Sequence, residues 1–344
     1  MSQAMRGVYT IPSTPFDDAG EIDQEGLRRT VDFCVECGAH GLVYPVNASQ
    51  FTTLSDAERL MGSRLVVEQC AGRIPVVIAS AGLSNSHAAM FAREAQAMGA
   101  DAVIAMCPYV SKIHDADSVV AYYRAISDEI DMPIFIQNHA VGSDLSVAVL
   151  ARLIQEVEHV EYIKEETMPA THKLSELMAM NNPKLKGVFG GSGGRYLLLE
   201  HPRGSAGQMP GCHVTDVVVR LWNSLEAGDT KEAKRIFGMM GPLFSIEMQC
   251  RGAIYKEVLR RRGVIRSARS RNAAPYQMDE QDHRALDEIL ADLEPLMAWH
   301  GPDSIPYGEA HADDPGVPGP IGVIPSGSAA VAGGAEGTLD EFDR

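Results

Sequence analysis

A lysine and two glutamates follow an apolar segment in the middle of the chain, at residues 162–167 (YIKEET). A lysine that points inward from the end of a buried strand loses its hydration, which favours the neutral amine. A neutral amine can attack a ketone to form a Schiff base. If the strand continues, Lys164 and Glu166 lie on the same side, and Glu166 could remove a proton from the carbon beside the iminium. The alternative interpretation is that Lys164 lies on the surface and pairs with the two glutamates.

Polar side chains also follow two other apolar segments. Gln137, Asn138 and His139 end one of them; amides suit carboxylate or hydroxyl groups, and an imidazole can carry protons. Asn47 and Ser49 follow the other, just ahead of a helix, where backbone amides suit a small carboxylate. We therefore predict that these side chains contact a small acid. The alternatives are a structural histidine and a simple turn before the helix.

A glycine-rich run, residues 190–194 (GGSGG), follows a further apolar segment. Glycine lets the backbone approach a ligand closely, so Gly191 and Ser192 join the candidate substrate-binding residues. The alternative is a loop that binds nothing. The run lacks the lysine of a phosphate-binding loop, and we find no metal-ligand spacing, so we expect neither a cofactor nor a metal.

Eight short apolar segments, rich in valine and isoleucine, are typical of buried parallel strands. They occupy residues 7–13, 41–46, 75–80, 102–106, 133–138, 160–165, 187–190 and 204–209. Helical patterns separate most of them, at residues 24–37, from 55 onward, and at 86–98, 116–129, 146–156 and 170–180. This alternation predicts a (β/α)8 TIM barrel, whose catalytic groups lie at the carboxyl ends of the strands. The competing doubly wound sheet would need a glycine-rich turn after the first strand, and residues 10–16 contain none.

After the eighth strand the pattern becomes helical, at residues 214–227, 230–249, 251–262 and 279–299. We therefore predict a barrel at residues 1–212 and a C-terminal helical region at residues 213–300. The basic run at residues 260–262 is expected to be a solvated face or a subunit contact. Residues 301–344 are rich in glycine and proline and carry 8 acidic residues and 1 basic residue, so we expect a flexible tail whose removal leaves activity unchanged.

The composition restricts the possible partners of this chain. Its 344 residues include 46 acidic and 30 basic ones, which gives a net charge of -16. This charge repels nucleic acids and anionic membranes, so neither is expected as a partner. We find no apolar run of membrane-spanning length, no secretory signal in the first residues, and too few cysteines for a disulfide scaffold. These features predict a cytoplasmic enzyme.

Several short motifs, taken in order along the chain, resemble those of the dihydrodipicolinate synthase / N-acetylneuraminate lyase superfamily of Schiff-base-forming lyases. They are residues 13–16 (STPF) with Asp23, residues 54–59 (LSDAER), residues 99–101 (GAD) before Pro108-Tyr109, and residues 163–165 (IKE). The resemblance runs from Gly7 to Trp299. It implies a (β/α)8 barrel with C-terminal helices and a homo-oligomer, either a tetramer or a dimer. It also implies that Lys164 forms an imine with pyruvate or another 2-keto acid.

Four features depart from the motifs of dihydrodipicolinate synthase itself. The family's G-T-T-G-E loop reads VNASQ at residues 46–50, and its two tyrosines are replaced by Gln137 and Val110. The loop after Asn138 also lacks the family's arginine. Dihydrodipicolinate synthase activity is therefore not expected.

The chain is more similar to the dehydratase branch of this family, typified by L-2-keto-3-deoxyarabonate dehydratase. That branch shares the pattern Lys-x-Glu-Thr at residues 164–167, the pair Lys173-Leu174, Gln137, and the pattern Asn-x-Ser at residues 47–49. The resemblance implies Lys164 as the nucleophile and Glu166 as the base, with Asn47 and Ser49 holding a carboxylate or hydroxyl of the substrate. The glycine-rich run at residues 190–194 differs from the corresponding loop of that branch.

We thus predict a dehydratase of a 2-keto-3-deoxy sugar acid. A pyruvate-releasing retro-aldolase shares the same imine and is one alternative. A sugar-acid-binding protein without catalytic activity is the other.

Overall fold

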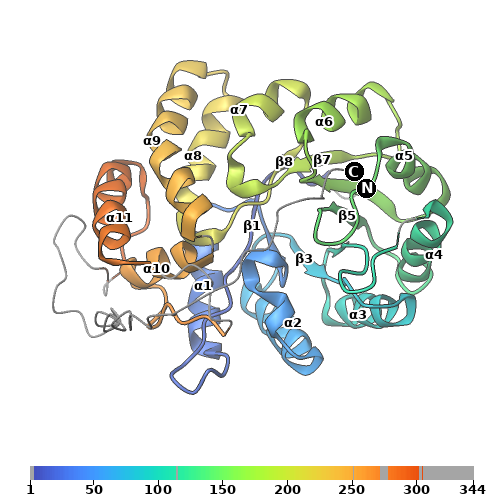
Figure 1. Cartoon of the computed structure of the whole chain (residues 1–344), viewed down its shortest axis with the longest axis horizontal. Coiled ribbons are helices and arrows are strands. Elements are labelled where there is room, and N and C mark those ends of the chain that lie inside the picture. The colour runs from blue at the N-terminus through green and yellow to red at the C-terminus, as the bar shows by residue number, and fades with distance from the viewer. Residues whose placement is uncertain (1–3, 114, 251, 272–277, 302–303, 305–344) are drawn as a thin grey trace, which may run out of the picture. The chain divides into compact units, whose positions relative to one another are not determined.

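Eight parallel strands form the centre of the molecule and close into a barrel (Figure 1). The computed structural model describes residues 4–113, 115–250, 252–271, 278–301 and 304. Each strand pairs with the next, and β8 pairs with β1 to close the barrel. The strands are β1 (Gly7–Thr10), β2 (Gly41–Tyr44), β3 (Val76–Ala79), β4 (Ala102–Ala105), β5 (Ile134–Asn138), β6 (Val160–Glu165), β7 (Gly187–Gly190) and β8 (Gly207–Gln208). The predicted (β/α)8 barrel is confirmed.

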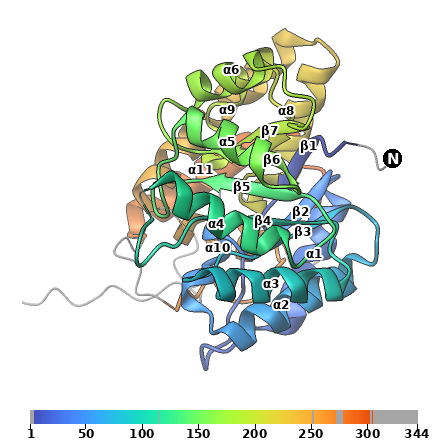
Figure 2. The same cartoon turned by 90° about the vertical axis from the view of Figure 1, so that its right-hand side faces the viewer.

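Helices follow the strands and cover the outside of the barrel; α3 and α4, for example, pack side by side in Figure 2. They are α1 (Gln24–Glu36), α2 (Asp56–Cys70), α3 (Asn85–Met98), α4 (Ala116–Ser127), α5 (Val147–Glu156), α6 (Ala170–Ala179) and α7 (Leu197–Glu200). Local sequence sets several ends: Ser55 and Glu58 form a capping box before α2, and Gly99 ends α3 at a φ of 87°. The four residues of α7 are too few for a helical period, and sequence analysis missed it.

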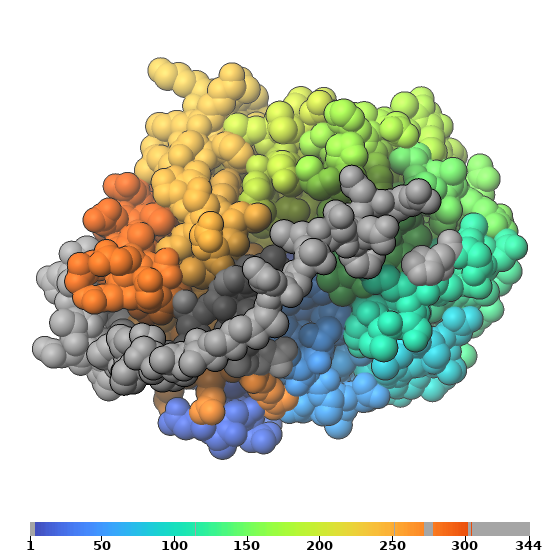
Figure 3. Space-filling view, viewed as in Figure 1, coloured from blue at the N-terminus to red at the C-terminus, as the bar shows by residue number. Residues whose placement is uncertain are grey.

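The C-terminal helices form a second packed layer beside the barrel. They are α8 (Thr215–Glu226), α9 (Thr230–Cys250), α10 (Gly252–Arg261) and α11 (Glu280–Leu293). The helices α9 and α11, gold and orange in Figure 3, pack against each other. The expected end of the last helix at Trp299 was wrong, because the chain changes to a 3-10 turn at Glu294–Leu296, where Pro295 lies.

The basic run at residues 260–262 is buried, so the expected solvated face was wrong. Arg262 is 0% exposed and donates to both carboxylate oxygens of Asp216 on α8. Asp216 also accepts a hydrogen bond from the backbone N–H of Ala298. The run therefore joins α8, α10 and the segment after α11.

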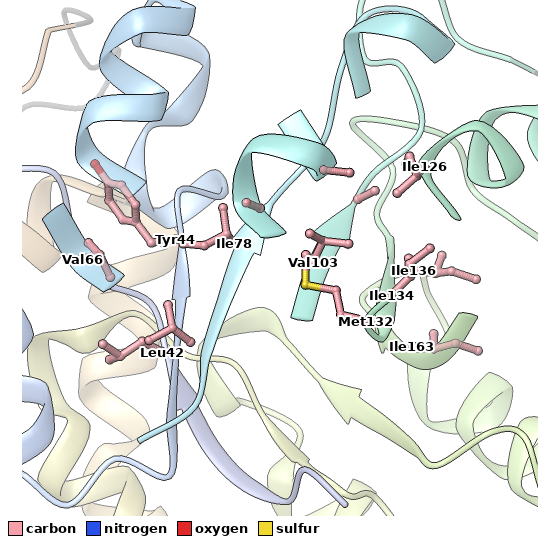
Figure 4. Close-up of a cluster of buried hydrophobic side chains, with 14 of the residues drawn as sticks. Leu42, Tyr44, Val66, Ile78, Val103, Ile126, Met132, Ile134, Ile136 and Ile163 are labelled. Carbon is pink, nitrogen blue, oxygen red and sulfur yellow. The ribbon is translucent and has the colours of Figure 1, made fainter. Parts of the chain in front are cut away.

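Side-chain alternation along the strands produces two apolar layers. Tyr162 stacks on Phe135 inside the barrel, with ring centroids 4.4 Å apart. Ile136 and Ile163 belong instead to the larger cluster between strands and helices (Figure 4). Lys164 follows Ile163, so this alternation turns its side chain into the barrel.

All described residues belong to one compact unit, so the barrel and the C-terminal helices are parts of one body. The division at residues 212 and 213 stays a proposal about its architecture. The predicted tail lies outside the described residues except for residues 301 and 304. None of the helices in the described ranges is long and apolar enough to cross a membrane.

Candidate active site

Lys164 and Glu166 form an ion pair at the carboxyl end of β6. The Lys164 Nζ lies 3.2 Å from Glu166 Oε2, and Lys164 as a residue is only 2% exposed. Tyr162, two residues earlier, belongs to the inner apolar layer, so Lys164 lies at the edge of that layer. A buried amine beside one carboxylate has a proton acceptor in direct contact, which is the geometry that the sequence predicts for a nucleophile and its base.

Three neighbours hold the Glu166 carboxylate in place. Gln137 Nε2 donates to Glu166 Oε2 at 2.9 Å, and the Ser192 N–H donates to Oε1 at 3.2 Å. A Cβ on Gly191 would lie 2.3 Å from Glu166 Oε1, so glycine is required for this close approach. The predicted residues Gln137, Gly191 and Ser192 are thus brought together around the predicted base.

Electrostatics favour an ionised Glu166 and a neutral His139. Burial would raise the pKa of Glu166, but Lys164, His139 and the hydrogen bonds from Gln137 and Ser192 outweigh it and lower that pKa. Burial also lowers the pKa of His139, against the opposing effect of Glu166. His139 Nδ1 accepts from the Val141 N–H at 3.0 Å, which leaves Nε2 as the protonated nitrogen of the neutral ring.

The loop after β2 contains Asn47 and Ser49 in a 3-10 turn at Asn47–Ser49. Ser49 is fully buried, and its hydroxyl donates to the Pro12 carbonyl at 2.8 Å. Thr14 Oγ1 in turn donates to the Ser49 carbonyl at 2.7 Å. Ser49 therefore anchors the loop to the segment after β1, whereas the side chain of Asn47 is half-buried at the end of the barrel that also holds Lys164.

Asn138 lies on the outer side of the barrel wall, so its side chain is turned away from Lys164, contrary to the expected contact with the substrate. In the strand register it pairs with Glu165, the neighbour of Lys164 that faces the opposite way. Its Nδ2 donates to Glu165 Oε2 at 2.8 Å and to the Leu145 carbonyl at 3.0 Å. Its Oδ1 accepts from the Leu145 N–H at 2.9 Å, so the amide serves to hold the loop after β5.

A buried network links this outer side of β6 to α6. Thr167 Oγ1 donates to Glu165 Oε1 at 2.5 Å, and Lys173 Nζ on α6 lies 2.5 Å from Thr167 Oγ1 and 2.6 Å from Asp144 Oδ1. Burial raises the pKa of Glu165, although hydrogen bonds from Thr167 and Asn138 and the charge of Lys173 oppose that rise. Thr167 and Lys173 thus fix the end of β6 that carries the lysine and the base.

Sequence analysis missed a polar cluster beyond the glycine-rich loop, made of Arg195, His213, Glu247 and Tyr255. His213 Nε2 lies 2.8 Å from Glu247 Oε1, and Arg195 Nη2 lies 3.7 Å from Glu247 Oε2. The Tyr255 ring stacks on His213 with centroids 4.4 Å apart. One signal in the sequence could have revealed this cluster: Glu247 follows Leu243 by four residues and therefore lies on the buried face of α9, where a charged side chain is unusual.

The arrangement supplies an amine nucleophile, an adjacent base and a neutral imidazole. Within the described ranges, no group of three or more His, Cys, Asp or Glu side chains is placed to hold a metal ion. The groups present suit imine formation with a ketone and proton removal from the neighbouring carbon.

Comparison with known proteins gives a consistent family relationship. Residues 4–292 match the Dihydrodipicolinate synthetase family. The L-2-keto-3-deoxyarabonate dehydratase of Azospirillum brasilense is 32% identical over 85% of this chain and 96% of its own length. The 4-hydroxy-tetrahydrodipicolinate synthase of Pelobacter propionicus is 30% identical over 65% of this chain and 76% of its own length.

Solved structures share the fold at lower sequence identity. A putative dihydrodipicolinate synthetase from Pseudomonas aeruginosa superposes with a TM-score of 0.78 at 21% identity. The match covers 84% of this chain and 99% of that one. The family relationship and the closed barrel therefore agree.

Proposed function

Because the chain belongs to the dihydrodipicolinate synthetase family and is a lyase, we propose that it removes water from a 2-keto-3-deoxy sugar acid through a Schiff base on Lys164. The observation that carries this proposal is the contact of Lys164 Nζ with Glu166 Oε2 at 3.2 Å inside the barrel. The similarity to a dehydratase over 96% of that relative's length supports the reaction type.

The reaction begins when Glu166 accepts a proton from the Lys164 ammonium. The freed amine attacks the C2 ketone to give a carbinolamine, and Glu166 returns its proton to the hydroxyl that leaves as water, which gives an iminium ion. The iminium draws electrons from C3, so the C3–H bond becomes acidic and Glu166, once its carboxylate is free, removes that proton. The resulting enamine expels the C4 hydroxyl, which leaves as water with the proton that Glu166 returns. Hydrolysis then releases the product and regenerates Lys164.

Three residues of this chain favour this reaction over dihydrodipicolinate synthesis. That activity relies in the family on a threonine and two tyrosines, and this chain has Asn47, Val110 and Gln137 at those positions. Gln137 binds the proposed base directly, at 2.9 Å. An amide here orients the carboxylate but cannot relay a proton as a phenol does.

A product analysis tests the proposal against its two alternatives. The purified protein is incubated with 2-keto-3-deoxy pentonate, and the mixture is followed by proton NMR. We expect a product lighter by one water, and no pyruvate. Formation of pyruvate and an aldehyde would instead identify a retro-aldolase. Binding of the acid without any conversion would identify a binding protein.

The proposal also includes a homo-oligomer, a dimer or tetramer, and a cytoplasmic location. One solved relative with this fold is described as a monomeric variant, so assembly is not uniform among these proteins. Light scattering of the purified chain measures its oligomeric state directly.

A further inference from the structure

The cluster of Arg195, His213, Glu247 and Tyr255 contains buried polar atoms that have no partner among the described residues. They are Arg195 Nε, His213 Nδ1 and Glu247 Oε2. Buried polar atoms are normally hydrogen-bonded, because an unpaired one costs free energy on burial. His213 and Glu247 are only 2% and 4% exposed. Three such atoms in one cluster point to a polar ligand.

The glycine-rich loop after β7 connects the cluster to the proposed base, Glu166. Gly191 and Ser192 contact Glu166, and a Cβ on Gly193 would lie 3.2 Å from Glu247 Oε2 and 4.0 Å from the Tyr255 hydroxyl. Residues 191 and 193 are two positions apart, so their Cα atoms are separated by at most about 7 Å. The glycine-rich loop therefore contacts both Glu166 and this cluster, and the glycine at position 193 leaves space beside Glu247.

We propose that this cluster is a subsite for the hydroxyl-bearing distal end of the substrate. Arg195 Nε–H is a free donor and Glu247 Oε2 a free acceptor, and a hydroxyl group can accept from one while it donates to the other. His213 Nε2 faces the Glu247 carboxylate, so in the neutral ring Nδ1 is an acceptor for a second hydroxyl. This inference rests on the proposed function, because it assigns the tail of the same substrate.

The charge of the cluster distinguishes between two kinds of substrate. Arg195 is balanced by Glu247, so its guanidinium offers no unpaired positive charge to an anion. A substrate ending in a second carboxylate would place it against the Glu247 carboxylate, which like-charge repulsion disfavours. The subsite therefore selects sugar acids that end in a neutral hydroxylated carbon.

Competition for the lysine tests the subsite independently of turnover. Pyruvate has no distal hydroxyl, so borohydride trapping of pyruvate measures Lys164 alone, and 2-keto-3-deoxy pentonate is added as the competitor. In Glu247→Gln and Arg195→Gln we expect pyruvate trapping at the wild-type rate. Competition by the pentonate should weaken by about 10- to 100-fold, as for loss of a hydrogen bond to a charged group. The control is Glu232→Gln, also on α9, which removes a surface ion pair with Arg235 and should change neither quantity.

Each outcome has a defined meaning. The subsite is overturned if the pentonate competes with pyruvate equally well in wild type and in both variants. It is also overturned if pyruvate trapping falls in parallel with competition by the pentonate, because that result indicates a purely structural cluster. It is also overturned if 5-keto-4-deoxyglucarate, which ends in a carboxylate, competes as well as the pentonate. A wild type that traps no pyruvate overturns the proposed function and, with it, the subsite.

Discussion

The surroundings of Glu166 determine the pH range in which it can act as a base. Burial favours its neutral acid, but Lys164, His139, Gln137 and Ser192 together lower the pKa below the usual value of a glutamate. The carboxylate is therefore ionised at neutral pH, and activity should fall only as the pH drops through that lowered pKa. Burial also lowers the pKa of His139 from its usual value, so its imidazole is neutral at neutral pH.

Replacing Gln137 should change the pH below which activity falls. Gln137→Met removes the hydrogen bond to Glu166 Oε2, so the ionised form loses stabilisation and the acid limb of kcat/KM should shift to higher pH by about one unit. Gln69→Met is the matched control, because Gln69 also donates to a carboxylate, that of Asp32, on the outer helices. A pH profile that is identical in wild type and Gln137→Met would contradict the assigned hydrogen bond.

The role of Glu166 as a base can be separated from its role beside the lysine. In Glu166→Gln, hydrogen exchange at C3 of pyruvate in heavy water should fall by about 100- to 10,000-fold, the usual contribution of a general base. Borohydride trapping, given longer incubation, should still reach a full adduct on Lys164. NMR of the exchange and intact-mass spectrometry measure the two effects. Exchange at the wild-type rate would assign the base to another group.

At the scale of elements, the network behind β6 should contribute to stability. Lys173→Met removes the cation beside Thr167 and Asp144 and should lower the free energy of unfolding by about 2 kcal/mol. Burial raises the pKa of Glu165 in the folded state. The free energy of unfolding therefore falls as the pH rises from the usual pKa of a glutamate through that raised value. Lys173 opposes this rise, so without it the pKa of Glu165 rises further, and the loss of stability should be larger at pH 7 than at pH 4.5, near the usual pKa of a glutamate.

Urea denaturation at the two pH values measures this effect. The control Lys186→Met removes an exposed ion pair with Glu161, where the lysine side chain is 43% exposed, and should change stability by less than about 1 kcal/mol. Equal losses in the two variants, or a loss independent of pH, would show that the network does not stabilise the end of β6.

The elements themselves could be predicted because their signals are local. Strand segments are short, apolar and rich in β-branched residues, and Ser55 with Glu58 forms the capping box that their spacing indicates. Lys164 and Glu166 could also be placed together, because two residues along a strand return to the same side. The expected substrate contact of Asn138 conflicts with the same alternation, because a strand that continues to residue 138 turns the side chains of Gln137 and Asn138 to opposite sides.

Other features depend on contacts between distant parts of the chain. Arg262 is buried because Asp216 pairs with it, 46 residues away, and the basic run alone does not reveal that partner. The distal cluster draws one residue each from the loop after β7, the turn after β8, α9 and α10. No spacing in the sequence records that these four segments meet.

At the scale of the whole molecule, the buried Asp216–Arg262 pair should hold the C-terminal helices to the barrel. The side chains are 1% and 0% exposed, and Asp216→Asn removes the carboxylate that pairs with the buried guanidinium. We expect a loss of about 3–5 kcal/mol in unfolding free energy. The control Asp32→Asn breaks an exposed pair with Arg73 and should have little effect.

Two probes show whether the barrel and the helices unfold together. Because both parts belong to one compact unit, loss of pyruvate trapping and loss of the native fluorescence of Trp222 on α8 and Trp299 after α11 should coincide in urea, in wild type and in Asp216→Asn. Separate transitions, or a midpoint that Asp216→Asn does not change, would show that this pair does not couple them.

The central claim is that Lys164 is the nucleophile, and the most direct measurement is the site of covalent attachment. Wild type, Lys164→Met and the exposed-lysine control Lys186→Met are reduced with borohydride in the presence of pyruvate, digested, and mapped by mass spectrometry. Lys256 is the informative competitor, because burial and the nearby Arg271 lower its pKa to about 7. We predict a single adduct on Lys164 in wild type and Lys186→Met, and none in Lys164→Met. An adduct on Lys256, or one that persists in Lys164→Met, would contradict the account.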